Sequence, residues 1–198
     1  MEDDDWVSAS LSKTSFPVTV SSDKEVTSNL LIKVTENAPA FYQGKVIIKA
    51  SSTSISSPIF TITEGYTEVT VQFTVGYHPL VRYEHKKGLL LEIGPTDVAD
   101  FETKITNLGN GETYVGIQPL DIPEGWRIST TSSVNLGSGV TGTGGNTETI
   151  HIIAKPPYGF GFHNDQVSFQ VRFTPVSRED PTQTGIAVSY THLTLPTN

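Results

Sequence analysis

Apolar side chains fall on every second residue along much of this chain, and that alternation limits the folds it can adopt. The clearest case is VTVQFTV at residues 69–75, where apolar residues alternate with threonine and glutamine. Successive side chains of a β-strand point to opposite faces, so this pattern predicts a strand with one buried and one wet face. Similar runs recur at residues 30–34, 46–50, 101–105 and 167–173. Such strands, separated by Gly, Pro, Asn and Ser, predict an all-β chain of antiparallel sandwiches.

The length and composition fit two sandwiches in tandem. A chain of 198 residues with only 17% charged side chains has room for two small β-domains. We predict β-sandwich domain 1 at residues 12–80 and domain 2 at residues 88–187, with the second truncated at its last strand. Residues 1–11 are expected to form an acidic N-terminal segment. Residues 81–87 are expected to form a linker, because the alternation lapses and charged side chains concentrate there.

The charge and the missing cysteines exclude several kinds of partner and site. The formal net charge is -8, and no stretch is rich in Lys and Arg, so no nucleic-acid partner is predicted. Without cysteine the chain has no disulfides, thiolate metal ligands or cysteine nucleophiles. No apolar run approaches the length that spans a bilayer, so no transmembrane segment is expected.

The second half of the chain carries a series of motifs in a fixed order. FETKITNLGNGETYV stands at residues 101–115, PEGW at residues 123–126 and IHIIAKPP at residues 150–157, followed by PPYGFGFHND at residues 156–165. With these motifs, residues 88 to about 175 resemble the immunoglobulin-like modules called NEW3 and, more loosely, CARDB. Such modules occur in archaeal and bacterial cell-surface proteins and beside some glycoside hydrolases.

The resemblance implies a fold and a role. The expected fold class is two tandem antiparallel immunoglobulin-like β-sandwich domains. The expected function is a non-catalytic structural or adhesive spacer of a larger extracellular protein, either secreted or membrane-anchored. Such modules carry no catalytic residues and need no cofactor, so we expect neither here. The expected partners are the neighbouring domains of the same chain, with carbohydrate or other surface proteins as the further candidates.

One tryptophan and four other apolar side chains are predicted to form the core of domain 2. Trp126 follows a Pro and a Gly that end the preceding segment, a place that suits a large ring packed between two sheets. The other four lie on the apolar faces of predicted strands, namely Phe101, Ile105, Phe169 and Phe173.

Three weaker patterns point to bound ions or nucleotides. Residues 137–142 fit G-x-G-x-x-G, but no helix follows, and a dinucleotide site needs one. His78 and His85 lie seven residues apart, and a zinc site would need two more ligands. A third alternative is a calcium ion held by loop oxygens, with the ligands Asn107, Asn110, Asp121 and Glu124. We predict hydrogen-bonding roles for the histidines and no metal.

An aromatic loop is the most distinctive candidate for ligand binding. Tyr158, Phe160, Phe162 and His163 follow two prolines, and glycines separate the three rings. Exposed rings would stack on sugars, which makes a carbohydrate-binding or accessory module of a hydrolase the alternative function. Buried rings would instead close the end of the sandwich and favour a spacer. An enzyme would require a cleft lined by converging carboxylates or histidines.

The last residues resemble no protein module. VSYTHLTLPT, at residues 188–197, resembles a translation of the transposase adapter used in sequencing libraries, so residues 188–198 are expected to be an adapter-derived tail. We therefore expect the chain to be a fragment of a longer protein. Ile186, Val188 and Tyr190 continue the period of two, so the tail is expected to have β-propensity.

Overall fold

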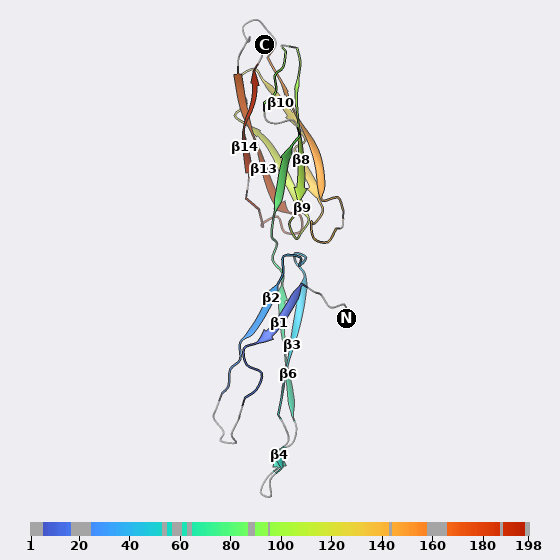
Figure 1. Cartoon of the computed structure of the whole chain (residues 1–198), viewed down its shortest axis with the longest axis vertical. Coiled ribbons are helices and arrows are strands. Elements are labelled where there is room, and N and C mark those ends of the chain that lie inside the picture. Colours follow the sequence, from blue (N-terminus) through green and yellow to red (C-terminus); the bar gives the residue numbers. More distant parts are fainter. Residues whose placement is uncertain are drawn as a thin grey trace. The chain divides into compact units, whose positions relative to one another are not determined.

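The chain divides into two compact units in a computed structural model, unit 1 from Met1 to Gly76 and unit 2 from Tyr77 to Asn198. The structure describes ten segments of the chain (Figure 1), which are residues 6–16, 25–52, 55–56, 61–62, 65–86, 90–94, 96–142, 144–157, 166–186 and 188–196. Within them the regular elements are β-strands, and the strand pairs are antiparallel. The predicted all-β, antiparallel fold class is confirmed.

Unit 2 contains two four-stranded sheets. The β8 sheet has the strand order β10-β12-β8-β7, and the β13 sheet has the order β11-β9-β13-β14. Their strands are β7 (Val81–His85), β8 (Ala99–Asn107), β9 (Thr113–Leu120), β10 (Arg127–Thr130), β11 (Ser133–Leu136), β12 (Thr147–Lys155), β13 (Gln166–Ser177) and β14 (Val188–Pro196). Side chains from both sheets join one buried cluster, so unit 2 is a β-sandwich.

The core of unit 2 holds the five side chains that the alternation and the Trp126 context predicted. Phe101, Ile105, Phe169 and Phe173 are at most 2% exposed, and Trp126 is 8% exposed. The rings of Phe101 on β8 and Phe169 on β13 meet edge to face, with their centroids 6.1 Å apart. This contact joins the two sheets directly, because each ring comes from a different one.

The predicted linker at residues 81–87 is replaced by a strand. Val81–His85 form β7, which pairs with β8 along the edge of the β8 sheet. Val81 and Tyr83 pack against the core, while Arg82 and Glu84 are exposed. The charged residues that suggested a linker therefore lie on the solvent-exposed face of an edge strand. Unit 2 begins at Tyr77.

The tail forms a regular strand pair with β13. Its residues Val188–Pro196 form β14, which lies beside β13 in antiparallel register with one irregularity between Phe169 and Gln170. Backbone hydrogen bonds can be made by almost any sequence, so β-propensity alone lets such a segment occupy a sheet edge.

Deleting residues 188–198 is expected to lower the stability of unit 2 and leave unit 1 unchanged. The deletion removes β14, which covers one edge of β13, and among the described strands β14 pairs with β13 of unit 2 and with none of unit 1. Urea unfolding followed by peptide-resolved hydrogen exchange would separate the two units. A shift in the unit 1 midpoint after the deletion would contradict the division of the chain.

Unit 1 consists of paired strands. Its strands are β1 (Val7–Leu11), β2 (Leu30–Val34), β3 (Gln43–Ser51), β4 (Ile55–Ser56), β5 (Thr61–Ile62) and β6 (Tyr66–Thr74). They form the two-stranded sheets β1-β2, β3-β6 and β4-β5. The segment predicted as an acidic N-terminus, residues 1–11, therefore includes β1. Within the described part of unit 1 the buried apolar side chains are Ala38 and Val75.

Candidate functional site

The aromatic loop proposed for ligand binding lies outside the described residues. Tyr158, Phe160, Phe162 and His163 all belong to the interval between β12 and β13 that the structure does not describe. The best-defined polar cluster of unit 2 lies elsewhere, at the end of the sandwich where β8 meets β9. It contains two of the calcium candidates and the glycine-rich loop, so it tests both of those hypotheses.

Asn107 organises this cluster from the last position of β8. Its side chain is fully buried, and its amide nitrogen donates to the carbonyl oxygens of Gly111 and Gly137, both at 2.8 Å. Its amide oxygen accepts from the backbone N–H of Gly109 at 2.9 Å. A buried amide of this kind is stable only when its donors and acceptor are paired. Asn107 thus ties its own turn to the glycine-rich loop.

Backbone N–H groups of the glycine-rich loop form hydrogen bonds with other groups of the protein. Gly139 N donates to Gly109 O at 2.9 Å, and Val140 N donates to the Ser138 hydroxyl oxygen at 3.1 Å. Ser138 is itself buried, and β12 follows the loop where a dinucleotide site would need a helix. The loop therefore closes the sandwich, and its geometry does not fit a phosphate cradle.

The first residues of unit 2 are bound to the same cluster. His78 N donates to the side-chain oxygen of Asn110 at 2.7 Å, and Leu108 N donates to Leu80 O at 2.7 Å. The Tyr77 hydroxyl lies 2.9 Å from the Thr113 hydroxyl oxygen, and burial raises the pKa of Tyr77. We call residues 77–80 the lead-in segment.

The approach of the lead-in segment explains one glycine. A Cβ atom at position 109 would lie 2.5 Å from His78 O and 2.9 Å from Leu80 N. Both are backbone atoms, so neither can rotate away. Gly109 therefore allows the close packing of the lead-in segment against the turn.

The calcium hypothesis is wrong for the four residues that it named. Asn107 and Asn110 precede β9, whereas Asp121 and Glu124 follow it. Seven residue steps of about 3.3 Å place the two ends of that strand roughly 23 Å apart. The side-chain oxygens of both asparagines also accept backbone N–H groups. One ion cannot be held by all four.

The two linker histidines are likewise separated. His78 precedes β7 and His85 ends it, so at least four steps of about 3.3 Å, roughly 13 Å, lie between them. His85 Nδ1 lies 2.9 Å from the hydroxyl oxygen of Thr103, which is fully buried. Within the residues that the structure describes, no cluster of three or more His, Asp or Glu side chains has metal-binding geometry.

Acid is expected to destabilise unit 2 through His85. Burial lowers the pKa of His85, so the unfolded chain, with a histidine pKa of about 6.5, binds the proton more readily. The associated stability is present above about pH 6.5 and is lost as pH falls through the folded-state pKa. Urea midpoints at about pH 7.5 and pH 5 should therefore differ less in His85→Gln than in the wild type. Equal acid sensitivity in both proteins would contradict this assignment.

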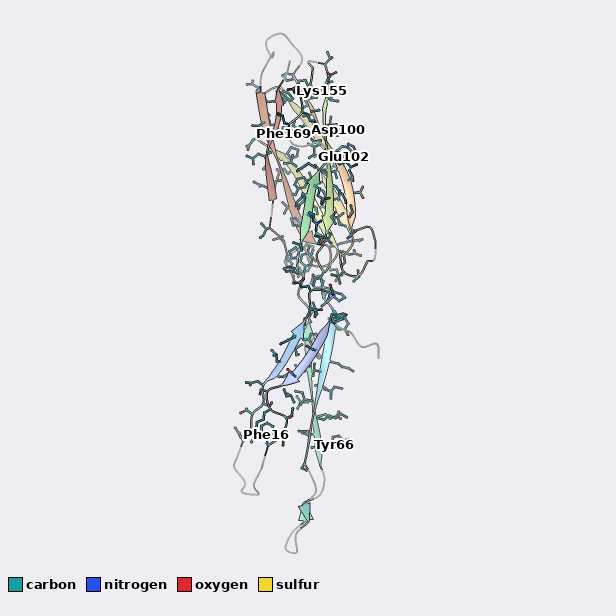
Figure 2. The ribbon with its side chains drawn as sticks, in the orientation of Figure 1. Phe16, Tyr66, Asp100, Glu102, Lys155 and Phe169 are labelled. Carbon is teal, nitrogen blue, oxygen red and sulfur yellow. The ribbon has the colours of Figure 1, made fainter. Side chains whose placement is uncertain are left out.

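The outward face of the β8 sheet carries ion pairs, whose carboxylates Asp100 and Glu102 on β8 are labelled in Figure 2. His151 Nδ1 lies 2.9 Å from Asp100 Oδ1, and Lys86 pairs with Glu102. The His151 and Asp100 side chains are 54% and 47% exposed, so their attraction is screened by water. A catalytic triad needs a hydroxyl on the second imidazole nitrogen, and among the described residues none contacts His151. This face is best described as a solvated surface.

An apolar groove of about 430 Å³ lies along β7. Its walls include Pro79, Leu80, Val81, Pro175 and Ile186. His78, Tyr83 and Thr184 also line the groove, and no carboxylate among the described residues does, so its contacts are mainly apolar. Within the described residues, no helix is long and apolar enough to cross a membrane.

Comparisons with known proteins give the fold no family name. No protein-family model and no curated protein matches the chain. Among solved structures, the ASH/PapD-like domain of human CEP192 (PapD-like domain 7) is similar over 60% of this chain and 84% of that one, with 10% identity and a TM-score of 0.43. Escherichia coli alpha-2-macroglobulin activated by porcine elastase is similar over 86% of this chain and 13% of that one, with 12% identity and a TM-score of 0.38. The assignment of an immunoglobulin-like β-sandwich therefore depends on the two packed sheets of unit 2.

Proposed function

We propose that the chain is a non-catalytic structural or adhesive spacer from a larger cell-surface or secreted protein. The observation that carries the proposal is the anchoring of the lead-in segment to the polar cluster of unit 2. The side chains of Asn107 and Asn110, which were candidates for an ion site, form hydrogen bonds with backbone groups instead. These bonds fix the start of unit 2 to its own sandwich.

The bonds of the lead-in segment suit a module that bears load. Tension on the start of unit 2 would act first on the bond from His78 N to Asn110 and on the bond from Leu108 N to Leu80 O. Both lie next to β7, so they must break before that edge strand can peel from β8. Unit 2 would therefore resist extension from its N-terminal end.

The extracellular location and the NEW3/CARDB resemblance belong to the same proposal. They are supported by the ordered motifs between residues 88 and 175, of which the one at residues 101–115 spans β8 and β9 and the one at residues 150–157 falls on β12. The absence of cysteine is compatible with a surface protein of a prokaryote, where many modules lack disulfides.

Single-molecule extension of the 198-residue protein tests the load-bearing role. We expect Asn110→Ala to lower the unfolding force of unit 2, because it removes the acceptor of His78 N. Asn135→Ala is the matched control, since Asn135 is exposed on β11. Equal unfolding forces for the two variants would contradict the role of the lead-in segment.

A glycan array tests the spacer against the carbohydrate-binding alternative. A spacer should show no saturable binding that depends on the aromatic loop. Sugar binding that disappears when Tyr158, Phe160 and Phe162 are all replaced by alanine would overturn the proposal in favour of a carbohydrate-binding module.

A further inference from the structure

The two longer strand pairs of unit 1 are strongly amphipathic. In β1-β2 the directly paired residues Val7 and Val34, Ala9 and Ile32, and Leu11 and Leu30 share one apolar face. In β3-β6 the pairs Val46 with Val71 and Ile48 with Val69 do the same. Val34 is 42% exposed and Val69 is 55% exposed, so these faces are incompletely covered by described residues. A two-stranded sheet is marginally stable in water, and a third strand stabilises it.

A groove of about 420 Å³ is lined by residues of both pairs. Residues 9–11 of β1 line one side together with Thr14 and with Leu30 of β2, and residues 46–49 of β3 line the other. Side chains of a strand alternate between its faces, so a sheet that meets a groove with one face contributes every second residue. Consecutive residues of β1 and β3 line this groove, so both strands meet it along an edge, and Leu30 adds one side chain from the face of the β1-β2 pair.

The hydrogen-bond pattern shows which backbone groups of β1 point into the groove. Thr35 N donates to Trp6 O, and Ser12 N donates to Asn29 O, so the even-numbered residues of β1 bond to β2. In an antiparallel pair the intervening residues direct their N–H and C=O groups to the opposite edge. The backbone groups of residues 9 and 11 therefore face away from β2, and both residues line the groove.

The same reasoning applies to β3. Ser52 N donates to Gly65 O, and Val75 N donates to Tyr42 O, so the even-numbered residues of β3 bond to β6. Ile47 and Lys49 therefore direct their N–H and C=O groups away from β6 and into the groove. In the part of the chain that the structure describes, β1 pairs only with β2 and β3 only with β6. The groove has open strand edges on both sides.

We propose that this groove accepts one extended strand from another protein, which pairs with β1 and β3 together. The inserted strand would turn two pairs into a single five-stranded sheet, a form of β-strand addition. Its apolar side chains would extend the apolar faces of both pairs. This surface is independent of the spacer role proposed for the chain.

The lysines of β3 indicate which side chains would suit the polar face of the incoming strand. Lys45 and Lys49 stand on the polar side of β3, and both are exposed. Lys49 Nζ lies 2.8 Å from Glu68 Oε1 on the β6 side, and no ion pair involves Lys45 among the described residues. Opposite charges on neighbouring strands stabilise a sheet. The partner is thus a segment whose apolar residues alternate with carboxylates and threonines.

Peptide binding to the 198-residue protein tests the acceptor groove. The probe is a fluorescein-labelled nine-residue peptide in which valine alternates with glutamate and threonine, and anisotropy reports binding. Ile47→Pro should weaken binding by about tenfold or more, because proline removes an N–H that points into the groove. That N–H is not used by the β3-β6 pair, and proline is tolerated at such edge positions.

Thr70→Pro is the matched control. Thr70 lies directly opposite Ile47 in the register, but its N–H points to the far edge of β6. Its affinity should stay within about twofold of the wild type, as should the far-ultraviolet circular dichroism of both variants. A probe with lysine in place of glutamate should bind more weakly. Equal binding by the two variants, or no binding by the wild type, would overturn the proposal.

Sedimentation of the protein alone tests whether a second copy of the chain occupies the groove. The chain should be monomeric, because the proposed strand comes from a different protein. A dimer that Ile47→Pro dissociates and Thr70→Pro does not would overturn this assignment and give the groove to a second copy of the chain.

Discussion

Replacing Phe169 with alanine is expected to lower the free energy of unfolding of unit 2 by about 3–5 kcal/mol. Phe169 is 1% exposed and meets the Phe101 ring across the two sheets. Its loss removes a large buried apolar surface and leaves a cavity that β-sheet backbones cannot close by relaxing. Phe101 comes from the other sheet, so the cavity would weaken the contact that holds the sandwich together.

Urea unfolding followed by tryptophan fluorescence measures this loss, because Trp126 lies in the same core. Tyr114→Ala is the matched control: it removes a ring of similar size that is 40% exposed on β9. The control should cost well under half as much. If Phe169→Ala and Tyr114→Ala cost the same, Phe169 is not a core residue.

Replacing Asn107 with alanine is expected to destabilise unit 2 by about 3–5 kcal/mol, a loss similar to that of a core ring. The substitution removes the side-chain partner of Gly137 O and of the Gly109 N–H, and it leaves Gly111 O with the Thr113 hydroxyl as its side-chain donor. Each buried polar group left without a partner costs about 1–3 kcal/mol. Released from Asn107, the glycine-rich loop should also exchange its amide hydrogens faster.

Asn135→Ala, on the exposed face of β11, should change stability by less than about 0.5 kcal/mol. Thermal unfolding and hydrogen exchange of residues 137–142 together distinguish the two asparagines. Unchanged exchange in the loop of Asn107→Ala would show that the loop is held by other contacts.

The core of unit 2 was predictable because its signal is local. Alternation of apolar residues places Phe101 and Ile105 on the core-facing side of β8 and Phe173 on the core-facing side of β13, without any knowledge of their partners. β7 was missed for the opposite reason. Val81 and Tyr83 keep the same period, but the charges between them resembled a linker, and an edge strand tolerates such charges on its wet face.

The polar cluster could be predicted only in part. Residues 107–111, Asn-Leu-Gly-Asn-Gly, are typical of a tight turn, but the partners of the Asn107 side chain lie both in that turn and 30 residues away at Gly137. A calcium site and a structural amide use the same residue types, and it is the length of β9 that places Asn107 and Asp121 far apart. Period two likewise predicted the strands of unit 1 but not their arrangement in pairs, because strand pairing depends on non-local contacts.

Residue-resolved hydrogen exchange of the native 198-residue protein tests most directly whether unit 2 is closed on its own core while unit 1 keeps open strand edges. The amides of Thr103 and Ile105, in the centre of the β8 sheet, should exchange only through global unfolding of unit 2. The amides of residues 9, 11, 47 and 49 should exchange with little protection. Strong protection of those four amides in the isolated protein, or one shared unfolding free energy for both units, would contradict the account.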